Sequence, residues 1–237
     1  MTSITTTESL HYLTASPWNI PSVRKVRDRD PLLITVSGNH SLGKSAFMHR
    51  LGARVYLQDN NTILIDESAF RHPPHSYGLK EAESNFFSLI VNMMAQRDIL
   101  INSWLNCGFN VIIERSFTED LMLSSLLNGV FLLSKDEITL HTQLHDFYVT
   151  GNRKPDCVIY FNHPAECSKF NHKCAFKEGF ISAFFCGGVN RVESFSACHS
   201  LYSEFLQNLC SEGVTVMEHN YECYEDTLVS EFMHRFF

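Results

Sequence analysis

Residues 38–45 combine glycines with a lysine and a serine in a spacing that suits the binding of phosphate groups. They match the pattern G-x-x-x-x-G-K-S, and in order they are Gly38, Asn39, His40, Ser41, Leu42, Gly43, Lys44 and Ser45. In this pattern backbone N–H groups of the turn surround phosphate oxygens, and the following helix N-terminus adds partial positive charge. Lys44 would reach the transferred phosphate, and the Ser45 hydroxyl would bind Mg²⁺. The pattern predicts that all eight residues bind MgATP; a glycine-rich turn without a ligand is the alternative.

A second pair of charged residues, Glu114 and Arg115, follows the apolar residues 110–113 directly. If that run is a parallel strand, the pair lies at its carboxyl end, where open α/β sheets bind ligands. The planar guanidinium of an arginine matches phosphate oxygens in a bidentate manner. The pair is therefore a candidate part of the same site, and a surface ion pair at a strand end is the alternative.

These side chains require a scaffold in which strands and helices alternate. Short apolar runs typical of strands buried on both faces occur at 31–36, 62–65, 110–113, 156–161 and 214–217. Helices are expected from Lys44 onward and over 81–105, 121–133, 135–147 and 192–210. This alternation predicts an α/β fold, a parallel β-sheet with helices on both faces. We expect one domain over 31–237, preceded by a flexible leader over 1–30.

Charge and hydropathy limit the classes of partner. The formal net charge is -7 at pH 7, which gives no general attraction to nucleic acid. No run of 18 apolar residues occurs, and the first residues lack the pattern of a signal peptide. The D-x-x-G and N-K-x-D motifs of GTPase switches are absent. We therefore expect a cytoplasmic protein that acts on a small molecule, with neither nucleic-acid nor membrane partners.

The two motifs together resemble the deoxynucleoside kinase family, which includes deoxycytidine and deoxyguanosine kinases and related thymidine kinases. In that family a strand ends in E-R-S and an aspartate follows after a short gap, as in residues 114–116 and Asp120. Residues 155–161 resemble its P-D-x-x-I-Y-L strand, and residues 218–220 match its closing segment. The resemblance spans roughly residues 31–235 and implies the P-loop nucleoside-kinase fold.

The resemblance also implies an activity and roles for residues. The reaction would transfer the ATP γ-phosphoryl group to the 5′-hydroxyl of a deoxynucleoside, with thymidine or another pyrimidine deoxynucleoside as the expected substrate and a homodimer as the expected assembly. Glu67 matches the general base, with Asp66 as its neighbouring competitor. Arg115 and Lys44 complete the catalytic set, and Ser45 and Glu114 would bind Mg²⁺.

Substrate and lid positions follow from the same resemblance, with two departures. The substrate-binding residues would be Glu67, Tyr77, Phe87, Arg97, Arg115 and Asp120. Ile90 stands where the family usually has a glutamine that reads the base, and Asn92 or Gln96 could replace it. Lys169 and Lys173 stand in the lid where the family has several arginines, and they would contact the ATP phosphates with less directional bonding.

Three alternatives remain open at this stage. The departures favour a nucleotide-binding scaffold that has lost turnover, whereas the intact phosphate motif favours an enzyme. A nucleoside monophosphate kinase would need additional cationic groups for a substrate phosphate. A zinc site formed by His163, Cys167, His172 and Cys174 is disfavoured, because their spacing matches no standard paired-ligand pattern.

Overall fold

The computed structural model describes residues 29–39, 41–66, 86–116, 119, 133–167, 170–171, 192–220 and 225–237. Structural statements below refer to these residues. Several predictions from the sequence fall outside them: nearly all of the expected leader, all but the last residue of the helix expected over 121–133, and the site residues His40, Glu67, Tyr77, Asp120, Lys169 and Lys173.

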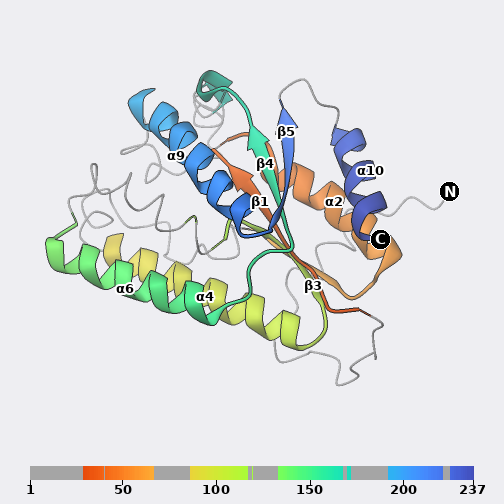
Figure 1. Ribbon diagram of the computed structural model, residues 1–237, viewed down its shortest axis with the longest axis horizontal. Helices are drawn as coiled ribbons and strands as arrows, with labels where there is room; N and C mark the ends of the chain where they lie inside the picture. Colours follow the sequence, from red (N-terminus) through yellow and green to blue (C-terminus); the bar gives the residue numbers. More distant parts are fainter. Residues whose placement is uncertain are drawn as a thin grey trace, which may run out of the picture.

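The centre of the molecule is a parallel sheet of five strands in the order β2-β3-β1-β4-β5 (Figure 1). The strands are β1 (Leu33–Gly38), β2 (Thr62–Ile65), β3 (Asn110–Glu114), β4 (Cys157–Asn162) and β5 (Thr215–Asn220). All five predicted strands are present. β1 begins and ends two residues later than expected, and β5 extends three residues further, to Asn220.

Helices cover both faces of the sheet, as predicted (Figure 1). On one face, α2 (Lys44–Gln58) and α10 (Glu225–Phe236) pack against each other. The other face carries α4 (Phe86–Asn106), α6 (Lys135–Gly151) and α9 (Val192–Ser211), with α4 and α6 side by side.

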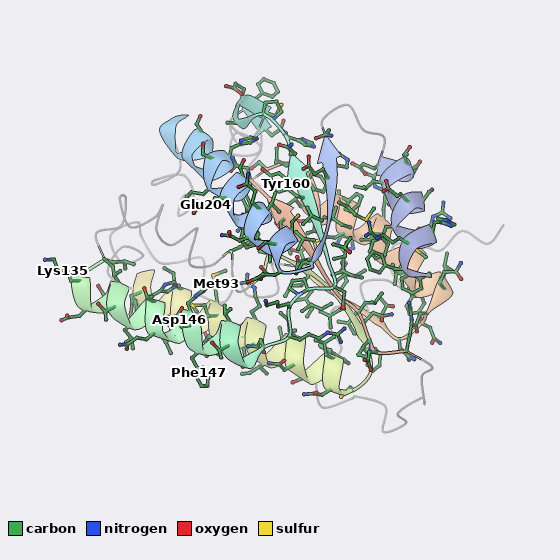
Figure 2. The ribbon with its side chains drawn as sticks, viewed as in Figure 1. Met93, Lys135, Asp146, Phe147, Tyr160 and Glu204 are labelled. Carbon is green, nitrogen blue, oxygen red and sulfur yellow. The ribbon has the colours of Figure 1, made fainter. Side chains whose placement is uncertain are left out.

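Alternating side chains of each strand fill the two cores. Ile34 and Val36 of β1 pack with Phe47, Met48 and Leu51 of α2, whereas Leu33 packs on the opposite face with the α4 side chains Ile101 and Trp104. On that second face, Tyr160 of β4, labelled in Figure 2, lies with its ring centroid 5.3 Å from that of Tyr202 of α9. Burial of β1 on both faces explains its continuous apolar sequence.

Helix α10 was not predicted from the sequence. It buries Leu228, Val229 and Phe232 at helical spacing, and its first turn carries two acidic residues that favour a helix N-terminus. Arg29, before β1, lies with its guanidinium 4.0 Å from the ring centroid of Phe237. α10 therefore closes the α2 face of the sheet. Across the described part of the chain, no helix has the length and apolar character needed to cross a membrane.

The strand order places one strand end at the centre of the fold. β1 lies between β3 and β4, with Val36 opposite Glu114 and Gly38 opposite Phe161. The chain first builds the β3 and β2 side of β1 and later the β4 and β5 side, so the strand order reverses at β1. Ligands of open α/β sheets bind at this point, outside the carboxyl ends of the strands.

Candidate active site

The turn after β1 has backbone angles that allow a phosphate-binding loop. Gly38 has a φ of 131°, and a Cβ placed on it would lie 2.9 Å from Phe161 Cβ and 3.0 Å from the Phe161 carbonyl oxygen. Ser41 and Gly43 have left-handed φ angles of 58° and 82°. Only glycine fits at position 38, because both the backbone angle and the adjacent strand exclude a side chain.

The N-terminus of α2 lacks a side-chain cap. Gly43 occupies the N-cap position in a left-handed conformation, no side chain bonds there, and the first turn contains no acidic residue. The first N–H groups of a helix have no partner within the helix, and their partial positive charge suits an anion. The loop and helix together thus form a surface suited to phosphate oxygens.

Three of the predicted residues meet between α2 and β3. Lys44 Nζ lies 3.3 Å from Glu114 Oε1 and donates a hydrogen bond to the Asn39 carbonyl oxygen at 2.6 Å. Ser45 Oγ donates to Glu114 Oε2 at 3.0 Å. Lys44 and Glu114 are 4% and 5% exposed. Lys44, Ser45 and Glu114, which the two motifs made candidates for one site, therefore lie in direct contact, and their roles in binding MgATP stay predictions.

Arg115 lies directly after β3 in an uncommon conformation. Its φ is 65°, its side chain is buried, and its N–H donates to the Val36 carbonyl oxygen at 3.1 Å. Non-glycine residues seldom adopt the left-handed backbone conformation, and they keep it only where the surrounding structure fixes it. The strained turn holds Arg115 beside the end of β1, so the alternative of a surface ion pair is wrong.

Glu119 is a buried acidic residue near this turn that sequence reasoning missed. Its Oε1 accepts hydrogen bonds from Ser37 Oγ at 2.6 Å and from the Ser116 N–H at 2.9 Å. Its Oε2 lies 2.9 Å from Tyr202 Oη, which is 3.1 Å from the Gly38 carbonyl oxygen. Burial raises the pKa of the Glu119 carboxyl, and its hydrogen bonds and the charge of Arg115 only partly offset this effect. Only its position inside the E-R-S…D segment could have drawn attention to it.

Two histidines, one directly after β4 and one in β5, lie in contact. His163 Nε2 lies 2.9 Å from His219 Nδ1, and the His219 ring stacks on Phe161 with centroids 4.3 Å apart. Burial, together with the charges of His219 and Lys44, lowers the pKa of His163 to about 4. Burial also lowers the pKa of His219. Both rings are therefore neutral near pH 7. In that state one ring nitrogen carries a hydrogen and donates it to the nitrogen of the other ring.

The described residues contain no group of three or more side chains that could hold a metal ion in the manner of a zinc site. His163 contacts His219, and His172 and Cys174 lie outside the described residues. The partner of His163 comes from β5, which is distant in sequence, so spacing along the chain could not have revealed it.

Helix α4 carries the expected Arg97 and the position of the missing glutamine. Arg97 is fully buried. Ile90 and Met94 form a small core with Leu133, Leu144 and Tyr148, so Ile90 serves packing at that position.

Asn92 is exposed and accepts a hydrogen bond from Gln96 Nε2 at 3.1 Å. Asn92 and Gln96 thus contact each other, and replacement of the glutamine by either residue stays a prediction.

Other predicted positions are only partly described. Phe87 is half-buried. In the expected lid segment, Asn171 Nδ2 donates to the Ser41 carbonyl oxygen at 3.0 Å. The segment after β4 therefore contacts the phosphate loop, although both lid lysines lie outside the described residues. Asp66 directly follows β2 and precedes Glu67, which lies outside the described residues.

Comparison with known proteins identifies the fold. No protein-family model matches the sequence, and no curated protein sequence is significantly similar to it. The structure of deoxyadenosine kinase from M. mycoides with bound dCTP matches with a TM-score of 0.64 and 15% identity, covering 86% of this chain and 98% of that chain. The chain has the fold of a deoxynucleoside kinase.

Two further structures of the same enzyme agree. With the products dCMP and a flexible dCDP bound, the TM-score is 0.64 at 16% identity; with dATP bound, it is 0.59 at 16% identity. Each covers 86% of this chain and 98% of that chain. The predicted P-loop nucleoside-kinase fold is therefore confirmed.

Proposed function

We propose that this protein is a deoxynucleoside kinase that transfers the γ-phosphoryl group of ATP to the 5′-hydroxyl of a deoxynucleoside. The observation that carries the proposal is the contact of Lys44, Ser45 and Glu114 at the carboxyl ends of β1 and β3. It brings the two sequence motifs together at the ligand-binding edge of a sheet whose fold is that of such kinases.

ATP would bind with its phosphates along residues 38–45. The backbone of the loop and the uncapped start of α2 would surround the phosphate oxygens, and Lys44 would turn from the Asn39 carbonyl toward the transferred group. Asn171 supports a lid close to the loop, where Lys169 and Lys173 would add positive charge. Phosphoryl transfer depends mainly on such positioning and on stabilisation of charge.

The oxygen atoms beside Lys44 fit Mg²⁺. Ser45 Oγ and Glu114 Oε2 lie 3.0 Å apart, and Mg²⁺ prefers oxygen ligands supplied by few side chains together with substrate phosphates. Ser45 and Glu114 would hold the ion, which would neutralise charge on the ATP phosphates. When ATP binds, the Glu114 carboxylate would exchange its contacts with Lys44 and Ser45 for Mg²⁺. The ion would then be its positive partner in the buried site.

The acceptor would bind across the crevice from ATP. Glu67 would accept the proton of the 5′-hydroxyl and Arg115 would orient the phosphoryl group. Tyr77, Phe87, Arg97 and Asp120 would contact the nucleoside. We propose a pyrimidine deoxynucleoside such as thymidine as the preferred acceptor, and the dCTP and dCMP bound by the M. mycoides enzyme support a site of this fold that accepts a pyrimidine.

Exposed apolar residues on α4 and α6 support a homodimer. Phe147 is 71% exposed, and Leu140 and Ile99 are exposed as well. Figure 2 shows Phe147 on α6 pointing away from the sheet. Exposed large apolar side chains favour a protein partner, and a second copy of the chain would cover them. Sedimentation of the purified protein tests this assembly.

A transfer assay with γ-labelled ATP tests the function. We expect label in a deoxynucleoside monophosphate with at least one of the four deoxynucleosides, and most with thymidine or deoxycytidine. Binding of MgATP without labelled product from any of the four would indicate a scaffold that has lost turnover. Label transferred to dTMP, with inhibition by dTMP and none by thymidine, would indicate a nucleoside monophosphate kinase.

A further inference from the structure

Glu119 joins three segments that are distant in sequence. It contacts Ser37 at the end of β1, Ser116 in the turn after β3, and Tyr202 in α9. Glu119 and Tyr202 are both fully buried. Tyr202 also contacts Gly38, the first residue of the phosphate loop, and Ser116 is adjacent to Arg115. The network therefore connects Gly38 with the turn that contains Arg115 through buried side chains.

The number of hydrogen atoms constrains the state of this network. Glu119 Oε1 accepts from the Ser37 hydroxyl and the Ser116 N–H. The phenol of Tyr202 has one hydrogen but two acceptors within reach, Glu119 Oε2 at 2.9 Å and the Gly38 carbonyl at 3.1 Å. If Glu119 Oε2 carries a proton, it donates to Tyr202, and Tyr202 donates to Gly38. Each contact then has one hydrogen, whereas an ionised Glu119 would compete with Gly38 for the phenol hydrogen.

We propose that Glu119, in its protonated form, is a positioning residue that fixes Gly38 through Tyr202 and the Arg115 turn through Ser116. This inference rests on the proposed kinase function of the site. The left-handed backbone of Arg115 requires such support, since a strained residue keeps its conformation only where its surroundings fix it. The phosphate loop and the arginine would thereby hold a constant separation, on which transfer depends.

The surroundings favour the protonated form. Within the described residues, the charged and titratable groups that act on Glu119 are Arg115, from the turn after β3, and Tyr202, from α9, while β1 contributes the uncharged Ser37. Burial raises the pKa of Glu119 despite Arg115. A folded-state pKa above the unfolded value gives stability that is fully present below the unfolded pKa and is lost as pH rises through the folded pKa.

Four variants test the proposal. Glu119→Gln keeps an acceptor for Ser37 and Ser116 and a donor for Tyr202, so we expect its kcat and MgATP affinity to stay within about threefold of the unmodified protein. Tyr202→Phe removes only the hydroxyl, and we expect kcat and MgATP affinity each to fall about tenfold, because the buried hydrogen bonds to Glu119 and Gly38 are both lost. Glu119→Ala should lower kcat about 100-fold through misplacement of Arg115. Glu212→Gln, on the surface, is the matched control.

Thermal unfolding against pH provides a readout that packing alone would not change. The loss of stability with rising pH attributed to Glu119 should disappear in Glu119→Gln. A folded Glu119→Gln protein as inactive as Glu119→Ala would overturn the proposal, because an ionised carboxylate would then be required. Unchanged kcat and MgATP affinity in Tyr202→Phe would overturn it as well.

Failure of the kinase function is distinguishable from failure of this inference. If the unmodified protein binds MgATP but transfers no label, the kinase function fails, and the MgATP affinity and the unfolding of the same variants still decide the role of Glu119.

Discussion

Lys44 Nζ lies 3.3 Å from Glu114 Oε1, and this contact joins the first residue of α2 to the last residue of β3. Both side chains are buried. An unpaired buried charge is strongly unfavourable, so each residue depends on the other while no ligand is bound. The same two groups would separate slightly to accept the phosphates and Mg²⁺ of bound ATP.

Removal of Lys44 alone should therefore affect stability as well as activity. We expect Lys44→Ala to abolish turnover and to lower the free energy of unfolding by about 3–5 kcal/mol, because Glu114 is left buried without its cation. The double variant Lys44→Ala with Glu114→Gln should recover most of this loss without recovering turnover. Denaturant titrations measure the coupling, with Lys154→Ala, an exposed lysine, as control. Additive losses in the double variant would contradict the pairing.

Glu67 should be required for transfer but not for binding of ATP. We expect Glu67→Gln to lower kcat at least about 100-fold, the usual contribution of a general base, while calorimetry finds MgATP affinity unchanged. Asp66→Asn is the matched control and should keep most of its activity. Full activity in Glu67→Gln with loss in Asp66→Asn would assign the base to Asp66.

Gly38 should not tolerate a methyl group. Gly38→Ala would bring its Cβ to 2.9 Å from Phe161 Cβ at a φ of 131°, and we expect a loss of about 2 kcal/mol or more in unfolding free energy together with weaker MgATP binding. Gly151→Ala at the end of α6 has open space for its Cβ, and thermal unfolding should show no loss. Equal stability of the two variants would contradict the close approach of β1 and β4.

The His163–His219 pair should make the protein sensitive to acid. The folded-state pKa of His163, about 4, lies below the ordinary value of 6.5. Its contribution to stability is present above the unfolded pKa and is lost as pH falls through the folded pKa. We expect Tm to fall between about pH 6.5 and pH 4, and the decrease to be smaller in His163→Gln. His234→Gln, at an exposed position of α10, should follow the unmodified protein. Identical profiles for both variants would argue against the pair.

The sequence allowed prediction of those parts of the fold that local patterns determine. β1, β3 and β4 were visible because both faces of each are buried, which leaves continuous apolar runs such as that at Ile34 and Val36. The two motifs, placed at the ends of parallel strands, indicated that Lys44, Ser45 and Glu114 belong to one site, but not that Lys44 and Glu114 are in contact. Strand ends were less certain, since Glu218 and His219 lie in β5 although they are polar.

Contacts between distant segments could not be predicted in this way. Tyr202 meets Glu119 because α9 packs over β4 and β5, and no spacing along the chain encodes that approach. His163 meets His219 for a similar reason, through the pairing of β4 with β5. The departure at Ile90 was visible in the sequence, but its packing role became clear only when Leu133, Leu144 and Tyr148 were found around it.

Calorimetric titration with MgATP tests the central claim most directly, because every proposed role depends on a phosphate loop that binds a nucleotide. We predict uptake at one site by the unmodified protein, in the micromolar to millimolar range usual for enzyme substrates, and no measurable uptake by folded Lys44→Ala. Absence of binding to the unmodified protein, or equal affinity in Lys44→Ala, would contradict the account.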